Sequence, residues 1–356
     1  MADGTWAAVF GNGYGSTSEK AMLYIVRLSD GALLKKIDTG AGSGANPNGL
    51  ASPTLLADGT RTIRAIYAGD LLGNLWEFDV SQTSTASWGA AYTNGGNPAP
   101  LFVARDKNGF RQPITAPVEI SRHPLGGYML FFGTGKFFET NDNIVGTNPQ
   151  VQSFYGIWDR TSSPATPVSG SRDTALTRQE IVYEGPAPNT AFEVRLTTAN
   201  EVDWATKRGW YIDLESPANG AEGERVVAAP ILRNGRIVFP TLIPSPDPCG
   251  FGGSSWLMEM DAISGARLAD SPLDITEDGD IDSDDEVVVD ADEDGKDDDA
   301  AVVSGVRSRE GIIRTPAVIG AGDKEYKIAS GTSGSVESLR ERGAFDRARG
   351  SWRQIR

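Results

Sequence analysis

The sequence predicts an all-β protein with the architecture of a β-propeller, from its composition, its strand periodicity and an internal repeat. Its 356 residues include 42 glycines and 20 prolines, residue types that end strands in turns. Short runs rich in aromatic and β-branched residues alternate with Gly-rich turns, which is typical of antiparallel strands. Residues 335–356 alone are compatible with a short helix at their start, and Gly343 and Gly350 would end it.

The internal repeat consists of a small residue, a proline and an apolar residue, placed before a strand-like run. It occurs as "SPTL" (52–55), "APVEI" (116–120), "APIL" (229–232) and "TPAV" (315–318). Four-stranded sheets repeated at intervals of this size are propeller blades. The intervals are irregular, so we expect inserted loops, and residues 140–152 and 161–178 have the composition of such loops.

The first 39 residues contain the second half of the same unit, a strand, a Gly-turn and two further strands. The segments "LSDGALLKKI" (28–37) and "DAISGARLAD" (261–270) are predicted to form the same hairpin twice. Roughly five blade repeats can be counted in this way.

Composition excludes several functions. A net charge of −15 argues against nucleic-acid binding, which selects basic surfaces. No run approaches the ~20 apolar residues of a membrane span. The first fifteen residues lack the basic start and apolar run of a signal peptide.

The chain has one cysteine, Cys249, and one histidine, His123. A structural zinc site needs more such ligands. We interpret His123 as a surface turn residue before Pro124. Cys249 also lies in a turn-like string, where it is inert or forms half of a disulfide with a partner outside this chain.

An enzyme is the alternative prediction, because propellers of this repeat type include quinone (PQQ)-dependent dehydrogenases. Such a site needs Ca²⁺, a quinone and a general base. One cysteine cannot form the vicinal disulfide that marks the best-known members. Asp70 and Asp79 stand at strand ends, where we expect them to cap turns. We therefore predict no catalytic or quinone-binding residues.

The acidic segment 274–299 contains fifteen Asp or Glu residues and one Lys, a net charge of −14. Ca²⁺ takes six to eight oxygens, and a turn with carboxylates at alternate positions can supply them. A block of like charge can also be a solvated acidic linker, which is the alternative interpretation. We favour two Ca²⁺ sites, because each of two loops has a glycine at its sixth position. The first predicted ligand set is Asp274, Thr276, Asp278, the carbonyl of Asp280, Asp282 and Asp285. The second is Asp290, Asp292, Asp294, the carbonyl of Lys296 and Asp298, and apolar runs on both sides predict a strand before and after this loop.

We accordingly divide the chain into propeller blades (1–270), the acidic calcium-binding segment (271–304), and the last propeller strands with a C-terminal tail (305–356).

Several motifs, in order along nearly the whole chain, resemble the C-terminal domain of the PilY family of type IV pilus tip proteins. The most specific are "YAGDLLGNLW" (67–76) and "SWLMEMDAISGARL" (255–268), and "FFGTGKFFE" (131–139) and the terminal "GSWRQIR" (350–356) agree with them. The resemblance implies a modified, quinoprotein-like seven-bladed propeller that binds Ca²⁺. The nine-residue pattern at 290–298 is the form of calcium loop that the family uses.

The resemblance also implies a function in pilus biogenesis. Family members promote pilus assembly, oppose retraction, and support adhesion and twitching motility. The implied partners are the minor pilins of the pilus tip complex and host or abiotic surfaces. The implied location is extracellular, at the pilus tip, after export through the periplasm.

Two departures from the family pattern lead to expectations of their own. Family members are far longer, so we expect this chain to begin inside the propeller and to form an open ring that exposes two sheet edges. Only Asp58 stands where an Asp-rich loop is expected just before "YAGD", so we expect that calcium site to be lost.

Overall fold

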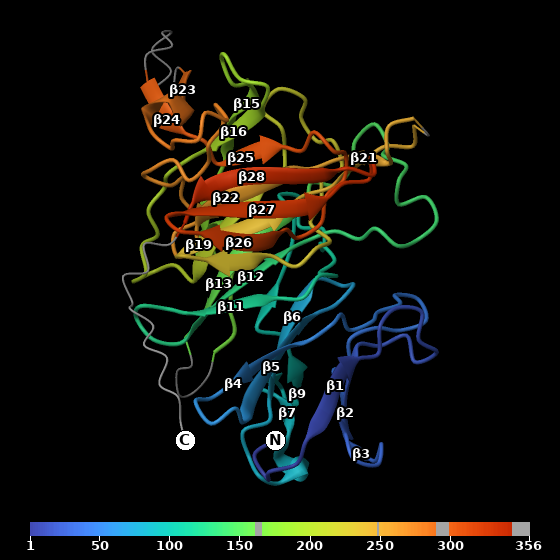
Figure 1. The fold of residues 1–356 in the computed structure, drawn as a ribbon. Helices are drawn as coiled ribbons and strands as arrows, with labels where there is room; N and C mark the ends of the chain where they lie inside the picture. The colour runs from blue at the N-terminus through green and yellow to red at the C-terminus, as the bar shows by residue number, and fades with distance from the viewer. Residues whose placement is uncertain (161–165, 248, 290–298, 344–356) are drawn as a thin grey trace, which may run out of the picture.

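The computed structural model describes residues 1–160, 166–247, 249–289 and 299–343. Strands dominate these residues, and helix is confined to α1 (Arg172–Ala175) and the 3₁₀ turns η1 (Thr85–Ser87) and η2 (Ser283–Asp285). Across the described ranges, no helix has the length and apolar character needed to cross a membrane. The all-β prediction is therefore confirmed (Figure 1).

Five sheets follow one another along the chain, and we call them blades 1 to 5. Blade 1 has the strand order β1-β2-β3, and blade 2 has the order β10-β6-β5-β4, with β7 also paired to β6. Their bounds are β1 (Ala7–Gly11), β2 (Met22–Arg27), β3 (Leu33–Asp38), β4 (Thr54–Ala57), β5 (Ile63–Gly69), β6 (Asn74–Asp79), β7 (Gly89–Ala90) and β10 (Phe102–Val103).

Blade 3 has the order β11-β12-β13-β17-β14, in which only β14 runs parallel to its neighbour. Blade 4 has six strands in the order β15-β16-β25-β22-β19-β18. The bounds are β11 (Glu119–Arg122), β12 (Tyr128–Gly133), β13 (Ser153–Asp159), β14 (Thr177–Gln179), β17 (Gly209–Asp213), β15 (Ile181–Pro186), β16 (Glu193–Thr197), β18 (Ile231–Arg233), β19 (Arg236–Pro240), β22 (Trp256–Asp261) and β25 (Gly305–Arg307).

Blade 5 is the three-stranded sheet β26-β27-β28. Three small hairpins complete the described fold: β8–β9, β20–β21 and β23–β24. The bounds are β26 (Ala317–Ala321), β27 (Lys324–Ser330), β28 (Val336–Arg342), β8 (Tyr92–Asn94), β9 (Asn97–Ala99), β20 (Ile243–Pro244), β21 (Gly253–Ser254), β23 (Glu286–Val289) and β24 (Asp299–Val302).

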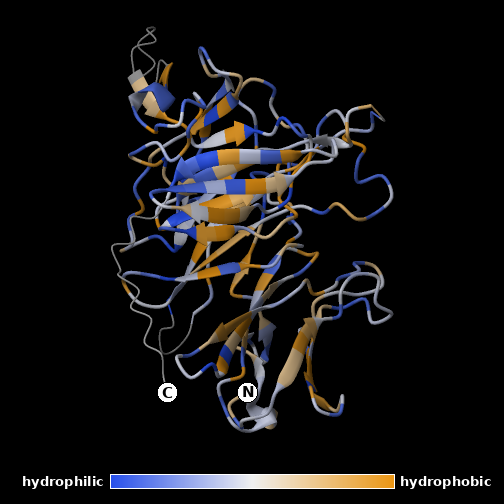
Figure 2. Ribbon diagram, in the orientation of Figure 1, coloured by the Kyte–Doolittle hydropathy of each residue, from blue (hydrophilic) through white to orange (hydrophobic). Residues whose placement is uncertain are grey.

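Each blade packs face to face on the next one. In β5, Ala65 and Tyr67 belong to the core shared with blade 3, whereas Ile66 and Ala68 belong to the core shared with blade 1. This alternation is the two-residue period of a strand buried on both faces. Two further apolar clusters join blade 3 to blade 4 and blade 4 to blade 5. The apolar residues of the central strands, which are coloured orange on the ribbon in Figure 2, therefore form four inter-blade cores in chain order.

The small-Pro-apolar repeat is confirmed as the lead into a strand. The four segments lead into or begin β4, β11, β18 and β26, each of which lies at an edge of its sheet. The segment that leads into the next blade passes close to a glycine at the end of a strand in the preceding blade. A Cβ on Gly69 would lie 2.2 Å from Ile114, and one on Gly133 would lie 2.2 Å from Val226.

Two sequence predictions were wrong. Residues 336–342 form β28, because the alternating burial of Glu337, Leu339 and Glu341 suits a strand on the blade 4 face. Residues 261–270 form the turn but no second strand, because both edges of β22 are already paired, with β19 and β25. The ends of the arc also expose sheet faces as well as edges: Phe10 of blade 1 is 46% exposed and Ile319 of blade 5 is 53% exposed.

The predicted inserted loops are found in part. Residues 140–152 contain no strand or helix. The segment 161–178 includes five residues outside the described part, and its second half forms α1 and the start of β14. After the acidic segment, β25 returns into blade 4, so residues 271–304 leave from and re-enter that sheet.

Candidate metal centre and its surroundings

The second predicted calcium loop, with Asp290, Asp292, Asp294, Lys296 and Asp298, lies outside the described residues. The strands predicted on either side of it are present. β23 and β24 pair in antiparallel register, with Val287 opposite Ala301. Val287 and Ala301 are buried in the core between blades 4 and 5, so this hairpin is anchored to the propeller.

The first predicted loop begins on the last strand of the propeller. The backbone N–H of Asp274 donates to the carbonyl of Arg340 (3.1 Å), which fixes the start of the loop against β28. The loop ends in η2, where Asp282 and Asp285 form a reciprocal capping box. Both ends of the loop are thus held by hydrogen bonds.

Three predicted ligands of this loop come together. Thr276 Oγ1 lies 3.4 Å from Asp274 Oδ1 and 3.2 Å from Asp285 Oδ1. Both carboxylates are buried. Burial raises the pKa of Asp285, and the neighbouring Asp274 carboxylate raises it further against the hydrogen bonds that the backbone donates. A buried carboxylate whose charge is disfavoured by a neighbouring carboxylate is a starting point for binding a cation.

The side chains of Asp278 and Asp282, two further predicted ligands, do not join them. Asp278 accepts a hydrogen bond from the backbone of Asp280 (2.9 Å), and Asp282 accepts one from the backbone of Asp284 (2.9 Å). Their side chains and that of Asp280 face solvent. Gly279 has φ = +101°, and its N–H donates to Asp274 Oδ2 (3.1 Å), so glycine serves the sharp turn as expected.

Basic side chains of blade 5 surround the loop. Arg340 Nη1 lies 2.7 Å from Asp274 Oδ2, and Arg342 donates to the carbonyl of Ile281 (3.0 Å). Lys324 donates to the carbonyl of Gly279 and lies 3.8 Å from Asp280 Oδ1. The sequence analysis missed these cations, because nothing in the sequence links residues that stand 44 to 66 positions apart.

The loop fits Ca²⁺ in part. Within the described ranges, no three Asp, Glu, His or Cys side chains converge as a metal cluster. Asp274, Thr276 and Asp285 supply three oxygens, whereas Ca²⁺ takes six to eight. Arg340 occupies one oxygen of Asp274, and Oδ1 of the same carboxylate faces Thr276 and Asp285.

The acidic residues near "YAGD" have structural roles. Asp58 accepts hydrogen bonds from the backbone of Thr60 (2.8 Å) and pairs with Arg64 (2.7 Å). Asp70 caps a buried turn through the N–H groups of Leu72 and Asn74, both at 2.9 Å. The prediction that Asp70 caps its turn is confirmed.

The prediction for His123 was half right. The residue lies in a turn closed by hydrogen bonds to Gly126 and Gly127, but it is buried. Its ring stacks on Trp158 with a centroid distance of 4.1 Å and meets the edge of Trp204. Burial lowers the pKa of His123 to about 4, so the ring is neutral at physiological pH. Cys249 is exposed and forms no disulfide in the described chain.

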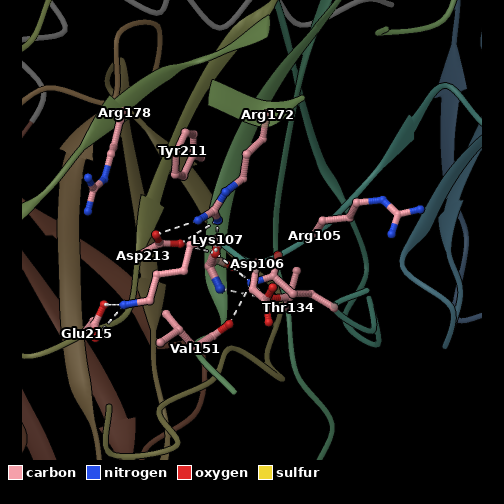
Figure 3. Close-up of polar contacts among 12 residues, drawn as sticks. Arg105, Asp106, Lys107, Thr134, Val151, Arg172, Arg178, Tyr211, Asp213 and Glu215 are labelled. Carbon is pink, nitrogen blue, oxygen red and sulfur yellow. Dashed lines mark hydrogen bonds and ion pairs between the residues drawn. The ribbon is translucent and has the colours of Figure 1, made fainter. Parts of the chain in front are cut away.

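A buried ion pair in blade 3 was also missed (Figure 3). Arg172 extends from α1 to Asp213 at the end of β17, with Nη1–Oδ1 and Nη2–Oδ2 distances of 2.7 and 2.8 Å. Ser153 donates to the same carboxylate (2.6 Å), and the guanidinium lies over the ring of Tyr211. This network fastens the inserted segment to blade 3.

A second buried charge cluster lies between blades 4 and 5. Lys327 bridges Glu259 (2.7 Å) and Glu341, and Arg236 bridges Glu259 (2.8 Å) and Glu325 (3.2 Å). Lys327 and the three glutamates are almost fully buried, and hydrophilic stretches of β27 and β28 are visible in Figure 2. Arg233 also pairs with Glu325 (2.7 Å), so three cations face three glutamates, and the buried charges have matched partners.

These features define a β-propeller protein. Five sheets pack face to face in chain order, their connections pass close to glycines at strand ends, and an acidic segment is inserted in the fourth sheet. A family model described as the PilY1 beta-propeller domain matches residues 1–192. The chain therefore belongs to the PilY1 β-propeller family.

Individual relatives agree with this assignment. A type IV pilus biogenesis factor PilY1 homolog from Xylella fastidiosa (strain Temecula1) is 41% identical over 276 residues, which is 74% of this chain and 18% of the relative. The type IV pilus biogenesis factor PilY1 of Pseudomonas aeruginosa (strain PAO1) is 36% identical over 310 residues, 80% of this chain and 26% of the relative. The chain thus spans roughly a fifth to a quarter of the length of these relatives.

The crystal structure of the Pseudomonas aeruginosa PilY1 C-terminal domain superposes with a TM-score of 0.79 at 28% identity. The match covers 96% of this chain and 70% of that one. The predicted propeller and the predicted family are both confirmed.

Proposed function

We propose that this chain is the propeller part of a type IV pilus biogenesis protein that binds Ca²⁺ and acts at the pilus tip. Its relatives are named type IV pilus biogenesis factors, and this similarity is the observation that carries the proposal. The protein promotes pilus assembly, opposes retraction, and supports adhesion and twitching motility. Its partners are the minor pilins of the tip complex and host or abiotic surfaces, and its location is extracellular.

Calcium binding is supported by the partly assembled first loop. Asp274, Thr276 and Asp285 would hold the ion from the buried side, and Asp278, Asp282 and the carbonyl of Asp280 would complete the shell from solvent. The second loop would bind a further ion between β23 and β24, whose pairing supports a closed hairpin at that place. Bound Ca²⁺ supplies charge neutralisation that ties the acidic segment to blade 5.

A chimera tests the pilus function directly. The matching segment of the Pseudomonas aeruginosa PilY1 protein would be replaced by this chain in a strain that lacks the native factor. We expect surface piliation and twitching zones well above those of the strain without the factor. A chimera that is exported and folded but leaves the strain without pili would contradict the proposal.

Calorimetry tests the calcium part separately. Titration of the purified chain with Ca²⁺ at about 0.5 M salt should still show binding, because screening over a few ångströms removes diffuse attraction but not direct coordination. Binding that disappears at this salt concentration would indicate an acidic linker. Turnover of an alcohol or sugar after reconstitution with the quinone and Ca²⁺ would instead support the dehydrogenase alternative.

A further inference from the structure

A cavity of about 450 Å³ opens at the end of the blades where β11, β18 and β26 begin. Its lining comes from segments far apart in the sequence, including Tyr14 after β1, Thr115 before β11, Ala228 before β18 and Arg314 before β26. Residues from four blades thus line one open cavity. Its volume lies within the range of small-molecule sites.

The walls of this cavity are mostly apolar and are held in place. The rings of Tyr14 and Phe138 stack in parallel at 4.3 Å, although Phe138 remains 45% exposed. The loop that carries Phe138 is fixed, because its N–H donates to Asp142 (2.9 Å) and Arg225 donates to the carbonyl of Lys136 (2.9 Å). The aromatic wall therefore exists before any ligand arrives, which lowers the entropy cost of binding.

The cavity also has one uncompensated positive charge. Arg314 lines it, is exposed, and makes no hydrogen bond or ion pair within the described part of the chain. The nearby Glu310 is bonded to the hydroxyl of Ser333 instead. Tyr14 adds no negative charge at physiological pH, where a phenol is neutral, and burial raises the pKa of this phenol further, to about 12.

We infer that this cavity binds an apolar group that carries a carboxylate, such as an aromatic or branched aliphatic acid. The apolar group fills the space beside Phe138, and the Arg314 guanidinium binds the carboxylate, for which its planar fork is suited. Such a group is either a free acid or the C-terminal residue of a peptide. The inference rests on the cavity alone and does not depend on the proposed pilus function.

Displacement of 8-anilinonaphthalene-1-sulfonate, itself an aromatic anion, tests this site on the intact chain. The competitors are 3-phenylpropanoate, its neutral amide, and the peptide Gly-Gly-Phe with a free or an amidated C-terminus. We expect saturable displacement in which each carboxylate competes about tenfold better than its amide, as for one charge-assisted contact. Displacement by the free peptide alone would identify a chain end as the ligand, and displacement by 3-phenylpropanoate alone would identify a small acid. Equal competition by acids and amides would overturn the inference.

Variants locate the site. Arg314→Gln should weaken binding of the acids about tenfold and leave binding of the amides unchanged. Arg122→Gln, at an exposed arginine in β11, should change the affinity for neither. Ala228→Trp and Ser330→Trp should each fill the cavity and abolish displaceable binding, and the second lies at the exposed rim, where folding is not at risk. Retained binding in a folded Ser330→Trp variant, or binding lost only in Phe10→Ser on the outer face of blade 1, would place the probe elsewhere and refute the site.

Discussion

Asp274 Oδ2 lies 2.7 Å from Arg340 Nη1, so the first carboxylate of the predicted calcium loop already has a cation beside it. The Asp274 side chain is fully buried, whereas Arg340 is partly exposed on β28. A buried carboxylate needs such a partner. The same contact places a positive charge next to the position that Ca²⁺ would take, so Arg340 and Ca²⁺ compete for the charge of Asp274.

Arg340→Gln should therefore raise the calcium affinity of the first loop several-fold, since a repelling charge is removed. Without calcium the same variant should unfold at a lower temperature than the parent chain, and saturating Ca²⁺ should restore much of the loss. A calcium-indicator titration and a thermal melt measure the two effects. Arg122→Gln, the matched control, should change neither. A fall in calcium affinity would show that Arg340 organises the loop for binding.

Within the loop, Asp274→Asn should weaken calcium binding by an order of magnitude or more, because ligand charge tunes such sites. Asp284→Asn should be nearly silent, because Asp284 is exposed and not a predicted ligand. Equal losses in the two variants would indicate diffuse accumulation of Ca²⁺ on acidic residues. Alkylation of exposed Cys249 should leave both titrations unchanged.

The Arg172–Asp213 pair should be a major source of stability in blade 3. Both side chains are about 5% exposed, and Asp213→Asn removes the buried carboxylate that binds the guanidinium through two hydrogen bonds. The carboxylate that remains near the guanidinium, Asp173, is exposed and lies 3.8 Å from Arg172 Nε. We therefore still expect a loss of about 3–5 kcal/mol in the free energy of unfolding, measured in urea. Lys107→Gln breaks the exposed Lys107–Glu215 pair of Figure 3 and should cost about 0–1 kcal/mol. Similar losses in both variants would argue against a special role for the buried pair.

Crowding at the blade connections predicts a sharp response to one added methyl group. Gly69→Ala and Gly133→Ala each place a Cβ about 2.2 Å from a branched side chain of the next connection. Each variant should lose about 1–3 kcal/mol, the usual cost of overpacking. Gly59→Ala faces open space and should change stability little. If all three variants have the same melting temperature, the connections are packed less tightly than the distances suggest.

These glycines show what the sequence could and could not predict. Strand periodicity and the Pro repeat were sufficient for the blades, because both are local. The recurrence of Gly at the ends of "VFG" (9–11), "YAG" (67–69) and "FFG" (131–133) was a further local signal that could have been found. The Arg172–Asp213 and Asp274–Arg340 pairs could not, because only the packed fold brings such distant residues together.

A carboxyl pair on blades 2 and 3 makes stability depend on pH. Glu77 of β6 lies near Asp159, which accepts hydrogen bonds from Tyr67 (2.6 Å) and Tyr92 (2.9 Å). Burial, and then the charge of Asp159, raises the pKa of Glu77 from the ordinary 4.5 to about 8. Asp79 adds a further negative charge, and Arg208, which interacts with Asp159, is the facing cation.

Between pH 4.5 and pH 8 the folded state therefore binds a proton that the unfolded state has released. The stability from this group is fully present below pH 4.5 and is lost as the pH rises through 8. Glu77→Gln mimics the protonated carboxyl, so the variant should melt at a more constant temperature across this range and be more stable than the parent chain at pH 8. Glu201→Gln, at an exposed loop position, should keep the parental slope. Melting curves at pH 5 to 9 decide the matter, and an unchanged slope in Glu77→Gln would mean that another group carries the pH dependence.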